Sequence, residues 1–472
     1  MKDLKYLIIF LLTLCMCSRV NAANIVYPKT TTTKINSPVT FFIGNEKPDK
    51  KLKINGEEVT VHPSGGFYHV VKLNDGNNVF TIDNGNSSET KTYTIIKPII
   101  KETEDNQEYV SFDNDMTYIT IADNVPLRAF PNESGQGRLQ HLQKGIPLNI
   151  IGEQAGYYKA KLARDDYAWI DKKYVFRNDN FDNSPAKILS YDYEENIKDK
   201  TFTIKLDKKE PFILSETKTY KVIDNNYETF ATGLDLTIYN MTGYPENKYE
   251  LHISSDSILY GYKAFYNDAN ELIIKVKKHP KVSRSYPLKG VIITLDPGHG
   301  GDEFGAIGCL GDNEKDINLK FALEIKKALE KVGATVYLTR DNDSEIGLYD
   351  RVKFSQEKNS DIFISIHQNA LPDSQAESMK SGTGVYYFYP QSAQLANTIL
   401  KVLTKNLSMN NDKVHQESFA VVRNPESLSI LVEIGYIINP DDNAKLINHE
   451  FHKKTANAFV KALEKYYVDQ QN

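Results

Sequence analysis

Cysteine is nearly absent from this sequence, because its 472 residues include only Cys15, Cys17 and Cys309. The first two lie in an amino-terminal segment that we expect to be removed on export, which leaves Cys309 alone. A single thiol excludes a disulfide within the mature chain. An exported protein of this kind must therefore obtain its stability from packed apolar cores.

Long apolar runs are equally scarce, since only the first 22 residues contain one. Lys2 and Lys5 flank the start of an apolar stretch at 6–16, and Val-Asn-Ala at 20–22 offers the small residues that a signal peptidase recognises. The stretch is too short to span a bilayer comfortably. We therefore predict a signal peptide at 1–22, export to the periplasm or to the cell wall and extracellular space, and no stable membrane insertion after its removal.

Positive charge is not concentrated anywhere in the chain. The formal net charge is −5, and no long run of Lys or Arg occurs. Nucleic-acid-binding domains usually carry a basic patch or stripe that neutralises phosphates. The composition therefore gives no support for a nucleic-acid partner.

What the sequence does contain, over more than its first half, is short strands separated by turns. Alternating apolar residues recur at 52–56, 65–73, 78–82 and 91–96, and Asn55-Gly56 is a strong hairpin turn. We predict a small all-β domain at residues 23–98. This stretch resembles the immunoglobulin-like modules of bacterial surface proteins.

Five further short strands are expected between residues 116 and 177. They follow an acidic, turn-rich segment at 101–115 that we interpret as a linker. The Lys-Gly turn at 144–145, the Gly-Tyr-Tyr strand at 156–158 and the strand around Trp169 resemble, in this order, the bacterial Src-homology-3-like barrel. Residues 178–280 continue the strand pattern and are predicted to form a further β domain of uncertain type.

After residue 289 the pattern changes to strands that alternate with helices. Apolar residues at 319, 322, 325, 329 and 332 follow helical spacing, Gly333 is placed to end that helix, and 335–339 is the next strand. Helices are also expected at about 392–407 and 451–467. The fold class that follows is multidomain, in which all-β modules precede a C-terminal α/β domain at 289–468 with an open sheet between helices.

Three apolar runs of this α/β domain end in residues that can carry chemistry. Strands at 291–295, 361–366 and 429–432 lead into His299, His367 and Glu433. Open α/β sheets place their sites at the carboxyl ends of their strands. A second carboxylate near the following helix could reach the same edge, and the residue pattern leaves this choice open among Asp302, Glu303, Asp312, Glu314 and Asp316.

Several motifs of this domain, in order, resemble the zinc-dependent N-acetylmuramoyl-L-alanine amidases. They lie at 296–301 (Asp-Pro-Gly-His-Gly-Gly), 305–306, 314–319, 339–340, 365–370, 384–387 and 432–439. The resemblance implies that His299, Glu314 and His367 bind one Zn²⁺ and that Glu433 is the catalytic carboxylate. Two imidazoles and one carboxylate are also a typical catalytic zinc site, with a fourth position left for water.

The same resemblance implies a substrate and a reaction. The protein would hydrolyse the amide bond between N-acetylmuramic acid and L-alanine in peptidoglycan, as in cell-wall remodelling or cell separation. The segment between residues 370 and 384 is shorter than in family members that an occluding helix holds inactive. We therefore expect that no activator protein is required.

Roles can also be predicted for four further residues of this domain. Asn369, Arg340 and Arg351 resemble family positions, although Arg351 could simply pair with Asp350 or Asp361. Asp296 is expected to stabilise the turn after its strand rather than to bind metal.

Two other functions fit the same sequence. A cell-wall-binding scaffold without catalysis would explain why three β modules occupy more than half of the mature chain. A different zinc amidohydrolase, such as a deacetylase or a peptidase, would use the same donor residues.

Overall fold

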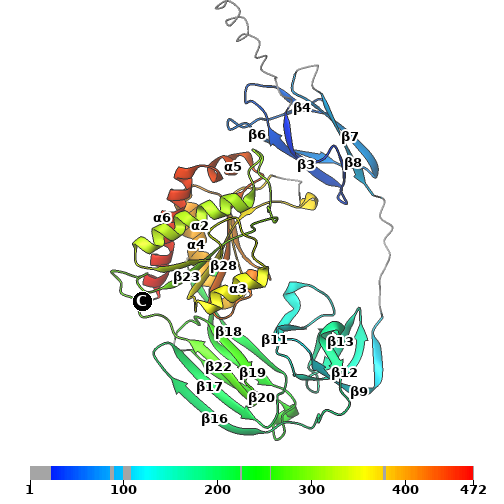
Figure 1. The fold of residues 1–472 in the computed structure, drawn as a ribbon, viewed down its shortest axis with the longest axis vertical. Helices are drawn as coiled ribbons and strands as arrows, with labels where there is room; N and C mark the ends of the chain where they lie inside the picture. The colour runs from blue at the N-terminus through cyan, green and yellow to red at the C-terminus, as the bar shows by residue number, and fades with distance from the viewer. Residues whose placement is uncertain are drawn as a thin grey trace, which may run out of the picture.

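The computed structural model describes residues 23–85, 90–98, 108–223, 226–255, 257–375 and 379–470. The predicted signal peptide at 1–22 lies outside these residues. β-strands dominate the chain as far as residue 277, and a domain of alternating strands and helices follows (Figure 1). Within the described ranges, no helix is both long and apolar enough to cross a bilayer. The predicted arrangement of β modules before a C-terminal α/β domain is confirmed.

The first β module consists of two sheets that share a core. Their strand orders are β1-β3-β6 and β2-β8-β7-β4-β5. The strands are β1 (Asn24–Tyr27), β2 (Thr32–Lys34), β3 (Val39–Asn45), β4 (Leu52–Ile54), β5 (Glu57–Val59), β6 (Gly66–Lys72), β7 (Gly76–Asp83) and β8 (Lys91–Lys97). The Phe42 ring of the first sheet lies edge-on to Phe80 and Tyr93 of the second, at centroid distances of 5.4 and 5.6 Å. The predicted hairpin is confirmed, because Asn55 and Gly56 have the positive φ that a two-residue turn between β4 and β5 requires.

The next strands form one seven-stranded sheet, in the order β11-β10-β14-β13-β12-β9-β15. They are β9 (Val110–Thr120), β10 (Val125–Arg128), β11 (Arg138–Leu142), β12 (Pro147–Gln154), β13 (Tyr157–Lys161), β14 (Tyr167–Asp171) and β15 (Val175–Arg177). The linker predicted at 101–115 was wrong from Val110 onward, because β9 begins there and pairs with Glu153 of β12. Pairing with a neighbouring strand outweighs the acidic, turn-rich composition of this segment.

A third β module has two sheets, ordered β16-β17-β22-β21 and β18-β19-β20. Its strands are β16 (Ile188–Glu195), β17 (Asp199–Leu206), β18 (Phe212–Ile223), β19 (Asn226–Ile238), β20 (Tyr249–Ser254), β21 (Tyr262–Tyr266) and β22 (Glu271–Lys277). Leu236 and Ile274 of this module belong to the same buried cluster as Leu127 and Ile150 of the seven-stranded sheet. These two β regions therefore share one core.

The α/β domain has one six-stranded sheet, in the order β24-β23-β25-β28-β26-β27. Its strands are β23 (Ile292–Pro297), β24 (Thr335–Leu338), β25 (Ile362–Asn369), β26 (Thr383–Tyr387), β27 (Asn411–Gln416) and β28 (Leu428–Tyr436). Its helices are α2 (Glu314–Lys331), α3 (Leu348–Glu357), α4 (Ala393–Leu407), α5 (Pro440–Leu446) and α6 (His449–Asp469). Only β26 and β28 pair antiparallel, so β23, β25 and β28 end at the same edge.

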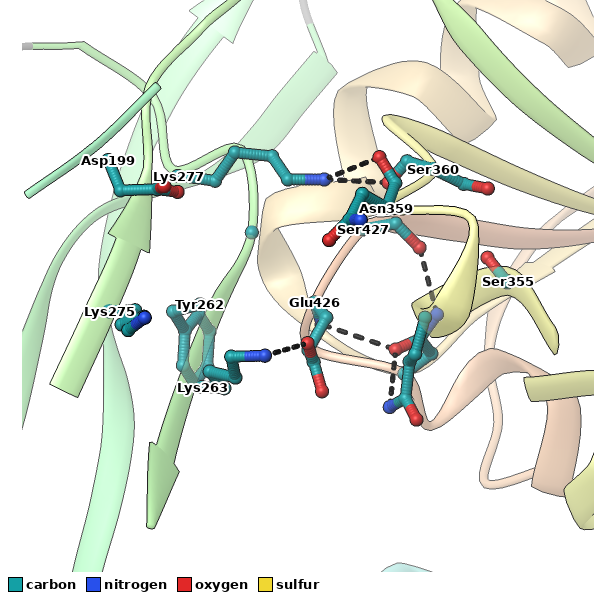
Figure 2. Close-up of a pocket in the computed structure, with 13 residues that line it drawn as sticks. Asp199, Tyr262, Lys263, Lys275, Lys277, Ser355, Asn359, Ser360, Glu426 and Ser427 are labelled. Atoms are coloured by element: carbon teal, nitrogen blue, oxygen red, sulfur yellow. Dashed lines mark hydrogen bonds and ion pairs between the residues drawn. The ribbon is translucent and has the colours of Figure 1, made fainter. Parts of the chain in front are cut away.

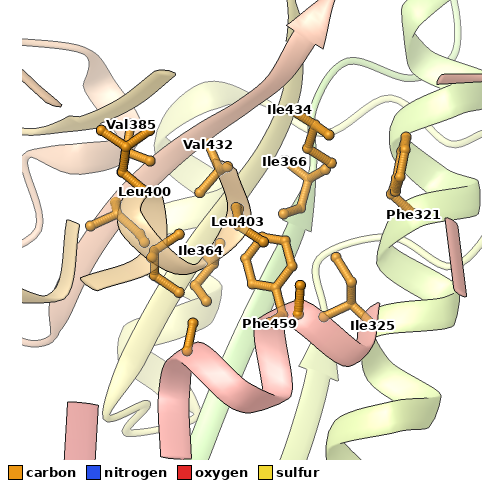
Figure 3. Close-up of a cluster of buried hydrophobic side chains, with 14 of the residues drawn as sticks. Phe321, Ile325, Ile364, Ile366, Val385, Leu400, Leu403, Val432, Ile434 and Phe459 are labelled. Atoms are coloured by element: carbon orange, nitrogen blue, oxygen red, sulfur yellow. The ribbon is translucent and has the colours of Figure 1, made fainter. Parts of the chain in front are cut away.

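Helices cover one face of this sheet and bury its apolar residues. Phe321 of α2, Leu403 of α4 and Phe459 of α6 pack against strand residues such as Ile364 and Val432 (Figure 3). Full burial of each large apolar side chain stabilises the fold by about 1.5–3 kcal/mol. Successive residues of a strand point to opposite faces. Accordingly Phe363 packs on the other face, with Val421, Val422 and Leu431 of a smaller cluster.

The first β module also contacts the α/β domain directly. Val39, Phe41 and Ile43 of β3 belong to the main buried cluster of that domain. Asp373, in the loop after β25, accepts hydrogen bonds from Tyr27 Oη and Thr40 Oγ1 at 2.9 and 2.6 Å. This module therefore holds the loop that follows His367.

Glu216 of β18 is buried where the third β module meets the α/β domain. Its Oε2 accepts a hydrogen bond of 2.8 Å from the Gln391 backbone N–H. Burial raises the pKa of Glu216 from 4.5 to about 8, because the few hydrogen bonds it receives do not replace water around a carboxylate. At neutral pH the buried group is therefore held mainly in its neutral form.

We expect Glu216→Gln to flatten the dependence of stability on pH. Between pH 4.5 and about pH 8 the folded protein binds more protons at Glu216 than the unfolded chain does. The contribution of this group is thus fully present below pH 4.5 and falls by up to about 1.4 kcal/mol per pH unit until about pH 8. Thermal unfolding at pH 5, 7 and 9 should show Glu216→Gln gaining stability over the parent as pH rises. The exposed Glu194→Gln serves as the control, and a parallel pH profile for Glu216→Gln and the parent would contradict this account.

Candidate metal centre

The residues predicted at the three strand ends meet at one edge of the sheet. β23, β25 and β28 are neighbours, and His299 follows β23 by two residues. His367 of β25 is directly paired with Glu433 of β28. Paired residues of adjacent strands point to the same face, about 5 Å apart. The sheet topology therefore brings these residues to one edge, as the sequence predicted.

Glu314 joins the two histidines. Its Oε2 lies 3.2 Å from Nε2 of His299, and its Oε1 lies 2.9 Å from Nδ1 of His367. The three ligand atoms all lie within 4.8 Å of one another, and the group could hold a metal ion. Glu314 is the first residue of α2 and is buried, so its helix carries the carboxylate to the sheet edge.

Backbone N–H groups orient this carboxylate. Gln368 N donates to Oε1 at 3.1 Å and Ala306 N donates to Oε2 at 2.9 Å. Burial pushes the pKa of Glu314 upward, but hydrogen bonds from His299 and His367 outweigh burial and hold it well below its ordinary value. The group is therefore an anion, which is the form that binds a cation.

Two glycines make room for the donors. A Cβ on Gly298 would overlap the imidazole of His367, and a Cβ on Gly305 would lie 2.5 Å from Oε2 of Glu314. His299 itself has a φ of +60°, a left-handed conformation that is uncommon for a residue with a Cβ. The Asp-Pro-Gly-His-Gly-Gly loop is thus shaped around the three donor side chains.

Glu433 is half-buried, and its Oε2 atom has no hydrogen-bond partner among the residues that the structure describes. Burial, followed by the charges of Glu314 and Asp412, raises its pKa well above the ordinary value. A buried carboxyl oxygen without a partner is costly in free energy. This position is therefore explained by a ligand or a reaction rather than by packing.

Comparison with known proteins identifies relatives of this chain. Residues 293–465 match the family model described as N-acetylmuramoyl-L-alanine amidase. The probable cell wall amidase LytH of Staphylococcus saprophyticus is 36% identical over 221 residues, which are 46% of this chain and 70% of that protein. The chain belongs to the N-acetylmuramoyl-L-alanine amidase family.

Other matches cover a similar share of this amidase-family chain. The probable cell wall amidase LytH of Staphylococcus epidermidis is 39% identical over 187 residues, or 39% of this chain. The chain spans 60% of the length of that relative. Among solved structures, the N-acetylmuramoyl-L-alanine amidase AmiC2 of Nostoc punctiforme is 30% identical, with a TM-score of 0.35, and covers 39% of this chain and 98% of its own.

A buried ion pair anchors the amidase-family loop that carries His299. Arg351 Nη1 donates to Asp296 Oδ1 at 2.8 Å, and Nη2 donates to the backbone oxygen of His299 at 2.9 Å. The suggested partners of Arg351, Asp350 and Asp361, were therefore wrong. Asp296 also accepts hydrogen bonds from Thr339 and Ser365, which fits the expected role in stabilising the turn.

Arg340 holds the same loop from its other side. It donates to the backbone oxygens of Pro297, Gly298 and Lys315 at 2.8 to 3.0 Å. Sequence reasoning did not reveal these contacts. Both buried arginines belong to motifs of the sequence. The partners of Arg340 are backbone oxygens, however, which no side-chain pattern predicts.

Proposed function

We propose that this protein is a zinc-dependent hydrolase of the amide bond between N-acetylmuramic acid and L-alanine in peptidoglycan. The observation that carries the proposal is the juxtaposition of His299, Glu314 and His367 with Glu433, whose buried Oε2 has no hydrogen-bond partner among the described residues. The match of residues 293–465, which are 173 residues, to the amidase family supports the choice of substrate.

The donor set fits Zn²⁺. A tetrahedral zinc ion with bonds of about 2.0–2.1 Å separates its ligand atoms by about 3.3 Å. One donor atom from each of His299, Glu314 and His367 lies within 4.8 Å of the other two, so small side-chain movements would bring the three atoms to that separation. When bound by His299, Glu314 and His367, zinc would supply a Lewis acid that lowers the pKa of water and polarises the scissile carbonyl.

The remaining chemistry falls to Glu433. Its strand places it beside His367, so its carboxylate would take a proton from the attacking water. The same group, once protonated, would give that proton to the departing amide nitrogen. Arg340 and Arg351 would hold the His299 loop in place during both steps, because they anchor its backbone oxygens.

Purified peptidoglycan tests the proposal. We expect incubation with the mature chain to release peptides that begin with a new free L-alanine amine, identified by mass spectrometry. A chelator should abolish the release, and added zinc should restore it. Release of acetate or cleavage within the peptide would instead indicate a different zinc amidohydrolase. Binding to insoluble walls without any released product would indicate a cell-wall-binding scaffold. The one feature that favours a scaffold is the extent of the β modules, which reach residue 277.

We infer further properties of the whole chain on the basis of the sequence. The inferred domains are an immunoglobulin-like module at 23–98, the third β module at 178–280 and the catalytic domain at 289–468. The Src-homology-3-like module predicted at 116–177 is extended to Val110, where β9 begins. Export through a signal peptide at 1–22 would bring the enzyme to the periplasm or the cell wall. Peptidoglycan is the expected partner, and an activator protein is not required.

A further inference from the structure

A cleft of about 770 Å³ lies where three parts of the chain meet. We call it the three-module cleft. The seven-stranded sheet contributes Arg128 and Arg138, the third β module contributes Lys263, and the α/β domain contributes Tyr389 and Arg423. Its volume is in the range of about 300–1,000 Å³ that is typical of ligand sites.

Three guanidinium groups line this cleft, and none of them forms an ion pair with a described carboxylate. Arg128 Nη1 donates to the backbone oxygen of Ser134 at 2.9 Å, and Arg138 Nη1 lies 3.3 Å from His141 Nε2. Arg423 Nη1 donates to the backbone oxygen and hydroxyl of Ser418. Across the described part of the chain, no Asp or Glu forms an ion pair with any of these three arginines.

Burial and the nearby positive charges lower the pKa of two residues of this cleft. Burial, followed by the charges of Arg423 and Arg128, lowers the pKa of Arg138. Burial, followed by the charges of Arg138, Arg423 and Arg128, lowers the pKa of His141 to about 4, so this imidazole is neutral at physiological pH. Like charges held together in this way are destabilising until an anion lies between them.

One polar atom of the cluster is left unsatisfied. The Nε of Arg138 is buried and has no hydrogen-bond partner among the described residues. A buried donor without an acceptor costs free energy, which a bound oxyanion would recover. Guanidinium groups bind carboxylates and phosphates through paired N–H donors, with geometry that lysine does not offer.

In a neighbouring pocket between two domains, two of the charged groups already have partners. This pocket of about 130 Å³ lies between the third β module and the α/β domain (Figure 2). Lys263 Nζ lies 3.0 Å from Glu426 Oε2, and Lys277 Nζ donates to the backbone oxygen of Ser360 at 2.7 Å. Because these ammonium groups already have partners, this pocket joins two domains and calls for no ligand.

The three-module cleft also contains carboxylates and aromatic rings. Glu133 and Asp350 line it, and neither has an ion-pair partner in the described ranges. The guanidinium of Arg128 lies 5.9 Å from the centre of the Tyr157 ring, and Tyr349 is 68% exposed. Five acidic side chains line the cleft in all, namely Asp123, Glu133, Asp171, Asp350 and Glu426. They would repel a polyphosphate, whereas a peptide with both carboxylate and ammonium groups complements the whole lining.

Tyr386 and Phe419 lie between the strand pairing of Glu433 and the lining of this cleft. Tyr386 of β26 lies two residues beyond Gly384, which is directly paired with the proposed catalytic residue Glu433 of β28. The rings of Tyr386 and Phe419 are 5.3 Å apart. Ala420, the next residue, already lines the cleft.

We propose that the three-module cleft binds a peptide arm of the substrate polymer through the carboxylates and ammonium group of that peptide, outside the metal centre. The identity of the polymer rests on the proposed function, but the binding itself does not require turnover. The seven-stranded sheet would then select walls by their peptide chemistry and present them to the α/β domain.

Isothermal titration with a soluble peptide that has free carboxylates and one free amine tests the proposal. The full mature chain carrying Glu433→Gln is used, so that hydrolysis does not enter the measurement. We expect Arg138→Gln/Arg423→Gln to weaken binding at least about tenfold, since hydrogen bonds to charged groups are lost. Arg423→Lys keeps the charge but loses the paired N–H donors of the guanidinium group, so it should weaken peptide binding less. Arg177→Gln on β15 should leave peptide binding unchanged.

Further probes separate the possible ligands. The same peptide with its carboxylates amidated should bind as weakly as the peptide does to the double variant. Inorganic phosphate and polyphosphate should bind more weakly than the intact peptide. Equal binding of peptide and polyphosphate, peptide binding that survives the double variant, or no peptide binding to the parent would each overturn the assignment. Peptide binding in a protein that releases no product from walls would leave this site standing and refute the proposed hydrolase.

Discussion

Glu433→Gln is expected to retain zinc and to lose hydrolysis of peptidoglycan by about 10²- to 10⁴-fold, the contribution typical of a positioned acid or base. Glutamine has the same shape but cannot take up or release the proton. No metal donor is changed, because His299, Glu314 and His367 form the cluster by themselves. The measurements are the initial rate of appearance of new amino termini from purified walls and the zinc content per chain.

The matched control is Glu450→Gln, an exposed carboxylate on α6 that should keep the parental rate. Full activity of Glu433→Gln would mean that another group takes the proton from water. Loss of zinc together with activity would instead make Glu433 a ligand, a possibility that its pairing with His367 leaves physically open. Only retained zinc with lost turnover fits the role proposed for it.

Much of the metal centre could be predicted because parallel strands impose it. His299, His367 and Glu433 each follow or end an apolar run, and carboxyl ends of adjacent parallel strands meet at one edge. The helix ending at Lys331 was equally predictable, since Gly333 adopts a positive φ of 93° just beyond it. In both cases a local pattern decides the structure.

The choice of Glu314 could not come from the pattern, because it depends on the path of a loop. Residues 302–313 fold back so that Ala306 N donates to Glu314, and an isolated bridge joins Ile307 to Asn313. Asp316 lies half a helical turn away and is exposed. Five acidic residues within fifteen positions look alike in a sequence, and only the three-dimensional course of the loop distinguishes them.

Contacts between modules were also beyond the sequence. Shared cores such as that of Leu127 and Leu236 arise because strands separated by more than a hundred residues bury apolar side chains against each other. The arginines of the three-module cleft come from β10, β11 and the segment before β28, so their convergence exists only once the modules are docked. Alternation within each strand predicts which face is buried but not which module covers it.

Glu314→Gln is expected to remove the metal and, with it, all detectable hydrolysis. The amide can still accept a hydrogen bond from Gln368 or Ala306, so the loop should stay folded. It supplies no negative charge, however, and its NH₂ group opposes one of the imidazoles. Removing a hydrogen-bond partner of a metal ligand typically lowers metal affinity about 10–100-fold. Because Glu314 is itself a proposed ligand, we expect a larger loss of zinc affinity.

Zinc titration of the metal-free protein with a competing chelator measures this affinity directly, whether or not the enzyme is active. Asp316→Asn is the matched control, because it removes a carboxylate from the same helical turn without touching His299 or His367. Normal zinc binding by Glu314→Gln with weakened binding by Asp316→Asn would move the third ligand to the exposed residue. Weakened binding by Glu314→Gln alone is what the two short imidazole distances require, because no other described carboxylate forms such a cluster with both histidines.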